Sequence, residues 1–367
     1  MIHMIKYINK TKPSVLAGTV LLRLDFNTTD NWRMQAVMPT ITFLLKTSSK
    51  IVIVSHRGRP DGFDKKLSLK KDTHQLSKLL SDKKVTFVDN FKFAEIKKQI
   101  TAAPKGSIFL LDNLRFLKGE EANSPELAKQ LASLADVYVN DAFAVAHRAN
   151  ASIAAITKFL PSYAGLELEK EITSLSKAII RPTRPLVLIL GGAKAVDKLG
   201  VIKFFEKKAD RFLLGGGSAN TILKMQGMDI GKSINDSDSE SLKTLKPLAT
   251  LKSVVLPVDF IWKKDTILDL GPKTVALFKK SIASAGTIVW SGPLGLIEKK
   301  EYAKSSIAIA QAIGHNKRAF SVSGGGETVM FLKQYKLDKN FSFISTGGGA
   351  MINFLAGEKL PGIEALK

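Results

Sequence analysis

Four times in the second half of this chain, an apolar run ends in consecutive glycines. Glycine permits sharp turns and lets backbone N–H groups approach a ligand, and a helix that begins there adds the positive end of its dipole. One such run often marks only a tight turn between a strand and a helix. Four runs at the carboxyl ends of parallel strands would meet at one edge of a sheet, which predicts a phosphate-binding surface. They are LVLILGGAK (from Leu186), RFLLGGGSAN (from Arg211), AFSVSGGGET (from Ala319) and FSFISTGGGAM (from Phe341).

Charged residues accompany these glycine runs. Lys194 and Lys198 follow the first run at a spacing that places them on one face of a helix, where lysine can neutralise phosphate oxygens. Glu327 directly follows a glycine run, and a carboxylate beside phosphates predicts a bridging Mg²⁺, although an acid in a first helical turn is favourable without a metal. The spacings GxxxxGK[ST] and GxGxxG are absent, so neither a P-loop NTPase nor a nicotinamide-dependent dehydrogenase is supported.

Arginine is scarce in the chain and is concentrated beside apolar runs in the first half. Its planar fork binds carboxylate or phosphate bidentately, so arginines kept at these places predict a second anion site. Other polar residues end the same runs, although each one alone could cap a helix or form a salt bridge. The arginines are Arg23, Arg33, Arg57, Arg59, Arg115 and Arg148, and the other polar residues are Asp25, Asn27, His56, Asn113, Asn140, Asp141 and His147.

The elements that must position these residues alternate between apolar runs and amphipathic stretches. Such alternation predicts a parallel sheet with helices on both faces, and it occurs in both halves. We therefore expect an α/β protein with two doubly wound, Rossmann-like lobes. The expected strands are TVLLRLDF (from Thr19), IVIVSH (Ile51), VTFVD (Val85), SIFLLDN (Ser107) and VYVNDAF (Val137), then the four glycine-ended runs with SVVLPVD (Ser253) and GTIVW (Gly286).

One helical segment stands between the two halves. Leu168, Ile172, Leu175 and Ile179 recur at helical spacing, and a proline-rich stretch follows. The pattern predicts a connecting helix over 165–180. We expect an N-terminal lobe over 1–164, a C-terminal lobe over 181–352, and a tail, 353–367, that can dock back on the N-terminal lobe.

The composition is typical of a globular protein with excess positive charge. The 367 residues, 45% of them hydrophobic, can form two cores. The net charge of +22 raises nucleic acid, anionic membranes and polyphosphates as partners, but the lysines are scattered over segments typical of solvated helix faces. The absence of cysteine excludes disulfides and thiol chemistry. The first residues show no export signal, and no apolar run approaches the ~20 residues that span a bilayer. These features predict a cytoplasmic protein.

The motifs, in order along nearly the whole chain, resemble those of the phosphoglycerate kinase family. So many ordered matches make chance an implausible explanation. They are RLDFN (from Arg23), HRGRP (His56), NLRF (Asn113), GEE (Gly119), YVNDAFAVAHRA (Tyr138), GGAKAVDK (Gly191), LLGGGSA (Leu213), LPVDF (Leu256), GPKT (Gly271), GPLG (Gly292), SGGGET (Ser323) and STGGGA (Ser345).

The resemblance implies an enzyme that transfers a phosphoryl group from 1,3-bisphosphoglycerate to ADP, giving 3-phosphoglycerate and MgATP. It also implies a monomer whose lobes close, with the connecting helix as the hinge. Arg33 and Lys194 would be catalytic, and Glu327 would hold the metal. The implied substrate-binding residues are Asp25, Phe26, Asn27, Arg33, His56, Arg57, Gly58, Arg59, Arg115 and Arg148. The implied nucleotide-binding residues are Gly192, Ala193, Lys198, Gly215, Ser291, Glu298, Gly325, Gly326, Glu327 and Thr328.

The chain departs from the family pattern in places. Glu327 stands where the family usually has aspartate, Ser291 replaces an asparagine, and Arg57 replaces an apolar residue. The segments after Asn27 and after Asp259 are shorter than in typical members. An alternative therefore stays open: a descendant of the enzyme that binds nucleotide or nucleic acid and has weakened transfer.

Overall fold

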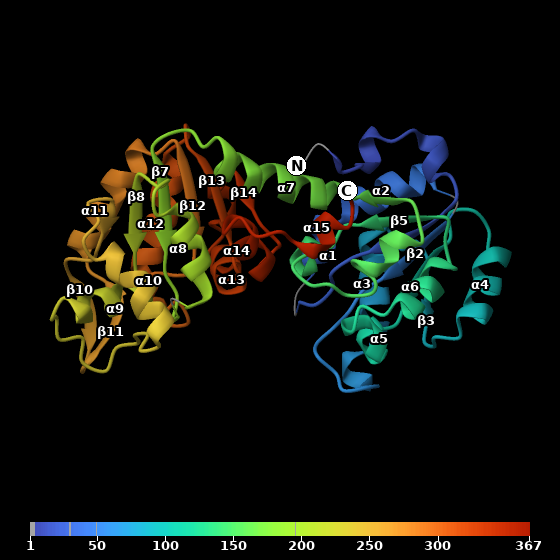
Figure 1. Cartoon of the computed structure of the whole chain (residues 1–367), viewed down its shortest axis with the longest axis horizontal. Helices are drawn as coiled ribbons and strands as arrows, with labels where there is room; N and C mark the ends of the chain where they lie inside the picture. The colour runs from blue at the N-terminus through green and yellow to red at the C-terminus, as the bar shows by residue number, and fades with distance from the viewer. Residues whose placement is uncertain (1–3, 29–30, 49, 195) are drawn as a thin grey trace. The chain divides into compact units, whose positions relative to one another are not determined.

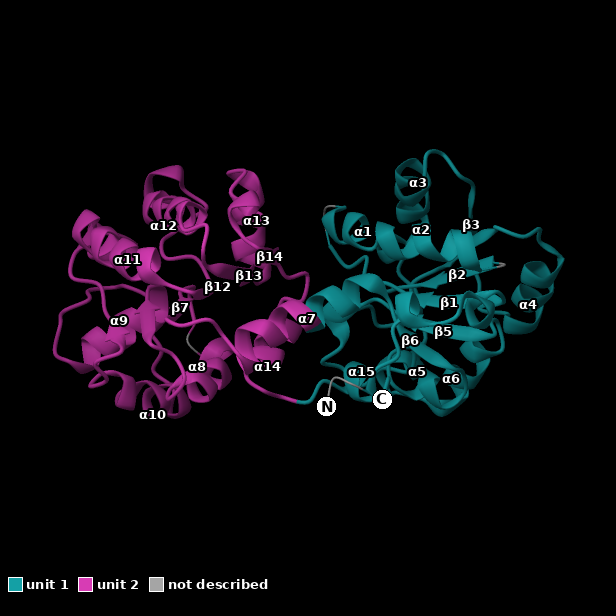
Figure 2. Ribbon diagram, turned by 90° about the horizontal axis from the view of Figure 1, so that it is seen from above, with its two compact units in different colours: residues 1–172, 359–367 teal, residues 173–358 magenta. Residues whose placement is uncertain are grey.

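The computed structural model, which describes residues 4–28, 31–48, 50–194 and 196–367, contains two compact units. Unit 1 comprises residues 1–172 and 359–367, and unit 2 comprises residues 173–358 (Figure 2). Each unit has a six-stranded, wholly parallel main sheet. The prediction of an α/β protein with two parallel-sheet lobes is therefore confirmed.

The sheet of unit 1 has the order β3-β4-β2-β1-β5-β6. Because its strands are parallel, their carboxyl ends share one edge, and this edge carries the polar residues singled out above. The central strands are buried along almost their whole length, as strands covered on both faces must be. The strands are β1 (Thr19–Arg23), β2 (Lys50–Val54), β3 (Val85–Val88), β4 (Ile108–Leu111), β5 (Val137–Asn140) and β6 (Ser162–Ala164).

Helices cover this sheet because each presents a few apolar positions to it. In α6 (Pro125–Ala132), Leu127 and Leu131 are buried, Pro125 occupies the first turn, and the Ser124 hydroxyl accepts a hydrogen bond from the N–H of Leu127. The other helices of this unit are α1 (Trp32–Ala36), α2 (Met38–Thr47), α3 (Lys70–Leu79), α4 (Phe93–Ala102), α5 (Lys118–Glu121) and α15 (Pro361–Glu364).

The sheet of unit 2 has the order β14-β13-β12-β7-β8-β9, and an antiparallel hairpin, β10-β11, lies outside it (Figure 1). All four glycine runs follow strands of this sheet, so they lie at one edge, as predicted. The strands are β7 (Leu186–Leu190), β8 (Arg211–Leu214), β9 (Val254–Val255), β10 (Phe260–Lys263), β11 (Thr266–Leu270), β12 (Thr287–Ser291), β13 (Phe320–Gly324) and β14 (Phe343–Ile344).

Two groups of helices enclose the sheet of unit 2. Figure 2 shows α11 (Pro272–Ser284) and α12 (Lys304–His315) on one side of β7 and β12, and α8 (Leu199–Phe205) and α10 (Ser239–Leu248) on the other. The core on the α11 side includes Trp290, the largest fully buried side chain among the described residues. The remaining helices are α9 (Gly216–Met225), α13 (Gly326–Gln334) and α14 (Gly349–Leu355). Among the described helices of both units, none is long and apolar enough to cross a membrane.

The predicted connecting helix is present as α7 (Leu166–Ile180), which begins in unit 1 and ends in unit 2. The unit boundary falls inside it, after Ile172, and not at its ends. Of the expected tail, residues 353–358 belong to unit 2, and residues 359–367 belong to unit 1. There the N–H of Gly362 donates to the carbonyl of Ala146 at 2.8 Å.

Three buried carboxyl groups lie at the start of α7. Asp141 accepts the N–H of Leu168, which satisfies a donor in the first turn of this helix. Burial raises the pKa of Asp141 to about 6. Burial, with the neighbouring Glu171 and Asp141, raises the pKa of Glu167 to about 8. The folded protein therefore holds Glu167 protonated at neutral pH.

Replacing Glu167 by glutamine should stabilise the protein at pH 8 more than at pH 5. In the unfolded chain the pKa of this carboxyl is 4.5, against about 8 in the folded protein. Its contribution to the free energy of unfolding is therefore fully present below pH 4.5. It is lost as the pH rises towards 8, because only the unfolded chain releases the proton in that range. Glutamine cannot ionise and avoids this loss. We expect the Tm at pH 8 to rise by about 2–4 °C, the shift that roughly 1 kcal/mol produces in a domain of this size.

The matched control is Glu169→Gln in the same helix. Glu169 forms an ion pair with Lys10, with 3.0 Å between Oε1 and Nζ. This variant should not gain stability at pH 8. An equal change in Tm at pH 5 and pH 8 for Glu167→Gln would contradict the assignment of a protonated Glu167.

Candidate functional site

An arginine and a carboxylate meet at the carboxyl end of β1 in unit 1. Nη1 of Arg33, which comes from α1, lies 2.9 Å from Oδ2 of Asp25 and 3.5 Å from the carbonyl oxygen of Asn27. Burial opposes ionisation of the Asp25 carboxyl, but the positive charges of Arg33 and Arg23 and the N–H of Asn27 hold its pKa below the usual value. Asp25 is therefore ionised and holds the Arg33 guanidinium in place.

His56 follows β2 and is buried, with an exposed fraction of 2%. Burial, assisted by Arg23, Arg115 and Arg148, holds the pKa of His56 well below its usual value. The imidazole is thus neutral at physiological pH. Nη2 of Arg23 lies 3.2 Å from Nδ1 of His56, and because a guanidinium can only donate, Nδ1 accepts. The proton then resides on Nε2, which is an N–H donor for an anion.

The other predicted arginines of unit 1 differ in their burial and in the contacts that they make with the protein. Arg115 and Arg148 are near enough to His56 for their positive charges to lower its pKa. Arg115 is buried, and it donates from Nη1 to the carbonyl of Gly58 and lies 3.2 Å from the Glu121 carboxylate through Nε. Arg148 is partly exposed, and Arg59 is exposed.

Arg57 directs its guanidinium onto another part of the protein. The group donates to the carbonyls of Phe26 and Thr28 and to the carboxylate of Asp72. The N–H of Gly58, the next residue, donates to the side-chain oxygen of Asn27 at 2.9 Å. The predicted substrate residues Phe26, Asn27, Arg57 and Gly58 are therefore tied to one another.

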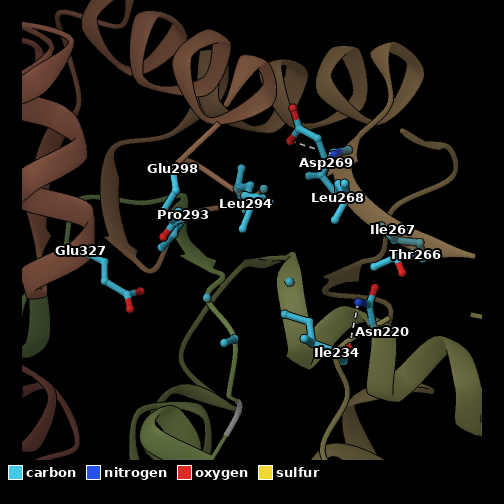
Figure 3. A pocket seen from close by; sticks show the side chains of 16 residues that line it. Asn220, Ile234, Thr266, Ile267, Leu268, Asp269, Pro293, Leu294, Glu298 and Glu327 are labelled. Atoms are coloured by element: carbon cyan, nitrogen blue, oxygen red, sulfur yellow. Dashed lines mark hydrogen bonds between the residues drawn. The ribbon is translucent and has the colours of Figure 1, made fainter. Parts of the chain in front are cut away.

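Unit 2 contains a pocket at the carboxyl edge of its sheet. Loops after β7, β8, β12 and β13 contribute to it, and the hairpin strand β11 forms one wall. In Figure 3, Glu327 projects from α13 at one end of the pocket, and Asn220, Ile234 and Thr266 lie at the other end. The lining residues are Gly192, Ala193, Gly216, Asn220, Ile234, Thr266 to Leu270, Pro293 to Leu296, Glu298 and Glu327.

Glycine is required where the loops of this pocket approach one another. A Cβ on Gly216 would lie 2.3 Å from the carbonyl oxygen of Gly192, and the positive φ of 55° at Gly216 also favours glycine. Gly215, just before it, is the N-cap of α9. Gly325 has a φ of 97° and is the N-cap of α13, whose first residue is Gly326. Of the helices that begin at this edge of unit 2, α9 and α13 thus start beside the pocket, and their N–H groups suit an anionic ligand.

Two lysines follow β7, and the structure places them differently. Lys198 is buried, and its Nζ lies 3.2 Å from the position that a Cβ on Gly192 would occupy. Burial lowers the pKa of Lys198, although Asp197, Glu327 and Asp236 favour its charged form. Lys194 is exposed and is not among the residues that line the pocket. Ala195, between them, lies outside the described residues.

Ser291 and Thr328 join the end of β12 to the start of α13. The Thr328 hydroxyl accepts the N–H of Gly292 at 2.9 Å, and a Cβ on Gly325 would lie 3.8 Å from both side-chain hydroxyls. Both residues are buried, whereas Glu298 and Glu327 are exposed carboxylates that line the pocket. Within the described residues, no three His, Asp or Glu side chains gather as a metal cluster.

Sequence reasoning missed the wall formed by β11 and the contributions of Asn220 and Ile234. A signal for the hairpin exists, since two apolar runs, FIW and TIL, flank Lys263 to Asp265, and Lys264 adopts a positive φ of 50°. The fourth glycine run, Gly347 to Gly349, does not line the pocket. Instead, Gly324 leaves room for Met351 after that run, because a Cβ there would lie 2.3 Å from the methionine sulfur.

The two units offer different binding chemistry. Unit 1 presents guanidinium groups and a neutral imidazole around Asp25, which suits a small anion that also carries a hydroxyl group. Unit 2 presents helix N-termini and carboxylates at one pocket, and the buried Lys198 lies close to Gly192, outside its lining, which suits phosphates with a cation. Such groups stabilise charge that moves between oxygens.

Known proteins with similar sequences and structures share one name. A family model described as phosphoglycerate kinase matches residues 13–358. The chain is 42% identical over 377 residues to the phosphoglycerate kinase of Dictyoglomus turgidum, covering 95% of both chains. It is also 42% identical to that of Acidobacterium capsulatum, covering 95% of this chain and 96% of the relative. The solved structure of phosphoglycerate kinase from Coxiella burnetii matches with a TM-score of 0.86 at 34% identity, covering 99% of this chain and 98% of that one.

Proposed function

Because this chain belongs to the phosphoglycerate kinase family, we propose that it transfers a phosphoryl group between 1,3-bisphosphoglycerate and ADP, giving 3-phosphoglycerate and ATP in glycolysis. The observation that carries the proposal is the division of binding chemistry between the units. In unit 1 the guanidinium of Arg23 contacts His56 and that of Arg33 contacts Asp25, and in unit 2 Gly216 at the start of α9 and Glu327 at the start of α13 line one pocket. Each unit therefore supplies the groups that one of the two substrates needs.

The glycerate substrate binds in unit 1 through groups of matching charge. The Asp25 carboxylate accepts a hydrogen bond from its hydroxyl, the side-chain amide of Asn27 donates one to the same hydroxyl, and the Nε2–H of His56 donates to an anionic oxygen. Arg59, Arg115 and Arg148 neutralise its phosphate and carboxyl groups. Burial of Asp25 and His56 supports these roles, because a buried polar group gains more from a directed hydrogen bond than an exposed one.

The nucleotide binds in unit 2. Gly192, Ala193, Gly215, Gly325 and Gly326 let backbone N–H groups approach the phosphates, and Lys198 supplies a positive charge beside them. Ser291 and Thr328 hold the start of α13 against β12, and the exposed carboxylate of Glu298 accepts hydrogen bonds from the ribose.

A magnesium ion fits the donor set at Glu327. This exposed carboxylate lines the pocket, and Mg²⁺ is commonly held by one or two carboxylates together with substrate phosphates. When bound, the ion would neutralise negative charge on the nucleotide phosphates. The protein's part is to keep the Glu327 side chain at the start of α13, free to take this role.

Transfer itself needs no acid or base. A terminal oxygen of the ADP β-phosphate forms a bond to the migrating phosphorus, the acyl phosphate P–O bond breaks, and a carboxylate leaves, so no proton moves. Arg33 and Lys194 would neutralise the charge on the migrating group. Bending within α7, the helix that begins in unit 1 and ends in unit 2, would let the units close and exclude water.

We also propose that the protein works as a monomer in the cytoplasm. Each binding site is assembled from the chain's own residues within one unit, which supports a monomer. Nucleotides and phosphorylated acids are metabolites of the cytoplasm, which supports that location. No finding favours the weakened nucleotide- or nucleic-acid-binding descendant.

A coupled assay tests the function directly. Purified protein with MgATP and 3-phosphoglycerate should form the acyl phosphate. A coupling dehydrogenase then reduces the acyl phosphate, and the loss of NADH absorbance measures the rate. Turnover must require both substrates. Absence of turnover with intact nucleotide binding would instead support the descendant without transfer.

Replacing Glu327 by glutamine should raise the Mg²⁺ concentration that gives half-maximal activity by about tenfold, because a charged ligand of the ion is lost. Replacing it by aspartate, which withdraws the carboxylate by roughly an ångström, tests how the longer side chain positions the ion and should lower the metal requirement. Titration of activity with Mg²⁺ at saturating nucleotide gives both values. An unchanged metal requirement in both variants would remove Glu327 from the metal site.

A further inference from the structure

Arg57 and Asp72 form an ion pair beside the segment that carries Asp25 and Asn27. Nη2 of Arg57 lies 2.6 Å from Oδ1 of Asp72 and 2.8 Å from the carbonyl oxygen of Phe26. Nη1 lies 2.8 Å from the carbonyl oxygen of Thr28. Three bonds thus direct the guanidinium of Arg57 onto the protein itself.

Asp72, the acidic partner of this ion pair, is buried. It lies in the first turn of α3 and is 4% exposed, which is unusual for an aspartate. Its burial raises its pKa even though Arg57 favours the ionised form. A buried carboxylate is costly unless it is paired, and here its partner is a guanidinium that also holds two backbone carbonyls.

The backbone of Arg57 is fixed as well. Its N–H donates to Oδ1 of Asn113 at 3.1 Å, and Nδ2 of Asn113 donates to its carbonyl at 2.7 Å. The side chain therefore extends from an anchored point after β2 to the segment after β1. In that segment, Phe26 and Thr28 flank Asn27, which is a predicted ligand of the substrate.

The same segment leads to Arg33. The guanidinium of Arg33 contacts Asp25 and the carbonyl of Asn27, so the position of this backbone decides where Arg33 is held. A shift of the carbonyls at Phe26 and Thr28 would move Asn27 between them and with it a contact of Arg33.

We propose that Arg57 is a positioning residue that, together with Asp72, fixes the backbone of Phe26 to Thr28 and thereby holds Arg33 in place for transfer. This role replaces the predicted one as a substrate ligand. The inference rests on the proposed function for the role of Arg33, whereas the fixing of the backbone is independent of it.

Two variants remove the ion pair: Asp72→Asn leaves only the charge of Arg57, whose side chain is 24% exposed, and the double variant leaves neither charge. Asp72→Asn keeps the shape of the side chain, and Arg57→Leu combined with Asp72→Val removes both charges, a change that proteins often tolerate. Arg57→Lys is the conservative variant. The matched control is Glu95→Gln, which removes an exposed ion pair with Lys92 in the first turn of α4.

We expect Asp72→Asn and the double variant to lower kcat by about tenfold or more, since small misplacement of a reacting group is costly, with KM for 3-phosphoglycerate changed by less than about threefold. Arg57→Lys, which keeps the positive charge, should have a kcat between that of the parent and that of the double variant. In an Arg33→Ala background the same substitutions should lower kcat by less than about twofold, because residues that act through one another are not additive. Glu95→Gln should behave like the parent.

Other outcomes overturn the proposal. If Arg57→Leu alone raises KM strongly while Asp72→Asn changes neither constant, Arg57 binds the substrate. If the effects multiply with that of Arg33→Ala, the ion pair does not act through Arg33.

Hydrogen exchange separates failure of this inference from failure of the proposed function. The amides of residues 26–28 should exchange faster in Asp72→Asn and in the double variant, and those of β3 should not change. This readout needs no turnover, so it holds even if the parent protein proves inactive in the coupled assay. Unchanged exchange at residues 26–28 in both variants would refute the fixing of the backbone.

Discussion

Replacing Arg33 by alanine should lower kcat by at least about 10²-fold, the loss expected when a charge contact made in the transition state is removed. The side chain is already held against Asp25 in unit 1, with 2.9 Å between Nη1 and Oδ2, so it needs little reorganisation to act. Initial rates in the coupled assay at saturating substrates measure the effect. KM for the nucleotide should change little, because the nucleotide pocket lies in unit 2.

The loss of Arg33 also leaves Asp25 without a partner, so stability must be followed in parallel. Arg33→Lys keeps the charge but loses the fork, and it should retain intermediate activity. A Tm within a few degrees of the parent would show that the loss is catalytic. A reduction of kcat below about tenfold in a folded Arg33→Ala variant would contradict a role at the migrating phosphoryl group.

Replacing Lys194 by alanine should also lower kcat by at least about 10²-fold. Lys194 is exposed in the loop after β7, so its removal should leave the core and the Tm unchanged. Lys198 is buried against Gly192, so its replacement should mainly raise KM for the nucleotide. Replacement of Lys194 should instead lower the rate of phosphoryl transfer.

Lys203→Ala is the matched control for Lys194. It removes an exposed lysine from α8, where Nζ lies 3.3 Å from the Glu240 carboxylate. Its kcat should equal that of the parent. If both lysine variants lose the same small factor at low salt and recover at higher salt, the effect is a general one of net charge, and Lys194 has no specific role.

Much of the fold could be predicted because its strands are buried on both faces. Such strands are continuous apolar runs, and glycines or polar residues end them, as in Leu186 to Gly192. Strand β6, Ser162–Ala164, was missed because three residues carry no periodicity. The hairpin β10-β11 was missed because its strands are mostly exposed or half-buried, so they lack a continuous apolar run.

The position of a candidate-site residue in the fold could be predicted where a single strand end supplies it. Asp25 and His56 are examples, since each follows a buried strand directly. The orientation of Arg57 could not be read in this way, because its partner Asp72 lies on a helix fifteen residues later in the chain and only the tertiary structure brings them together. The contacts of the Arg57 side chain with Asp72 and with the carbonyls of Phe26 and Thr28 therefore lie beyond what sequence patterns indicate.

The neutral imidazole of His56 has a consequence for how the site responds to pH. Protonation would make His56 positive and would strengthen its attraction for an anion. Because its pKa is well below 6.5, this happens only in solutions well below that pH. A mild fall in pH below about 7 should therefore leave His56 uncharged, so the proposed contact of its Nε2–H with an anionic substrate should not strengthen over that range.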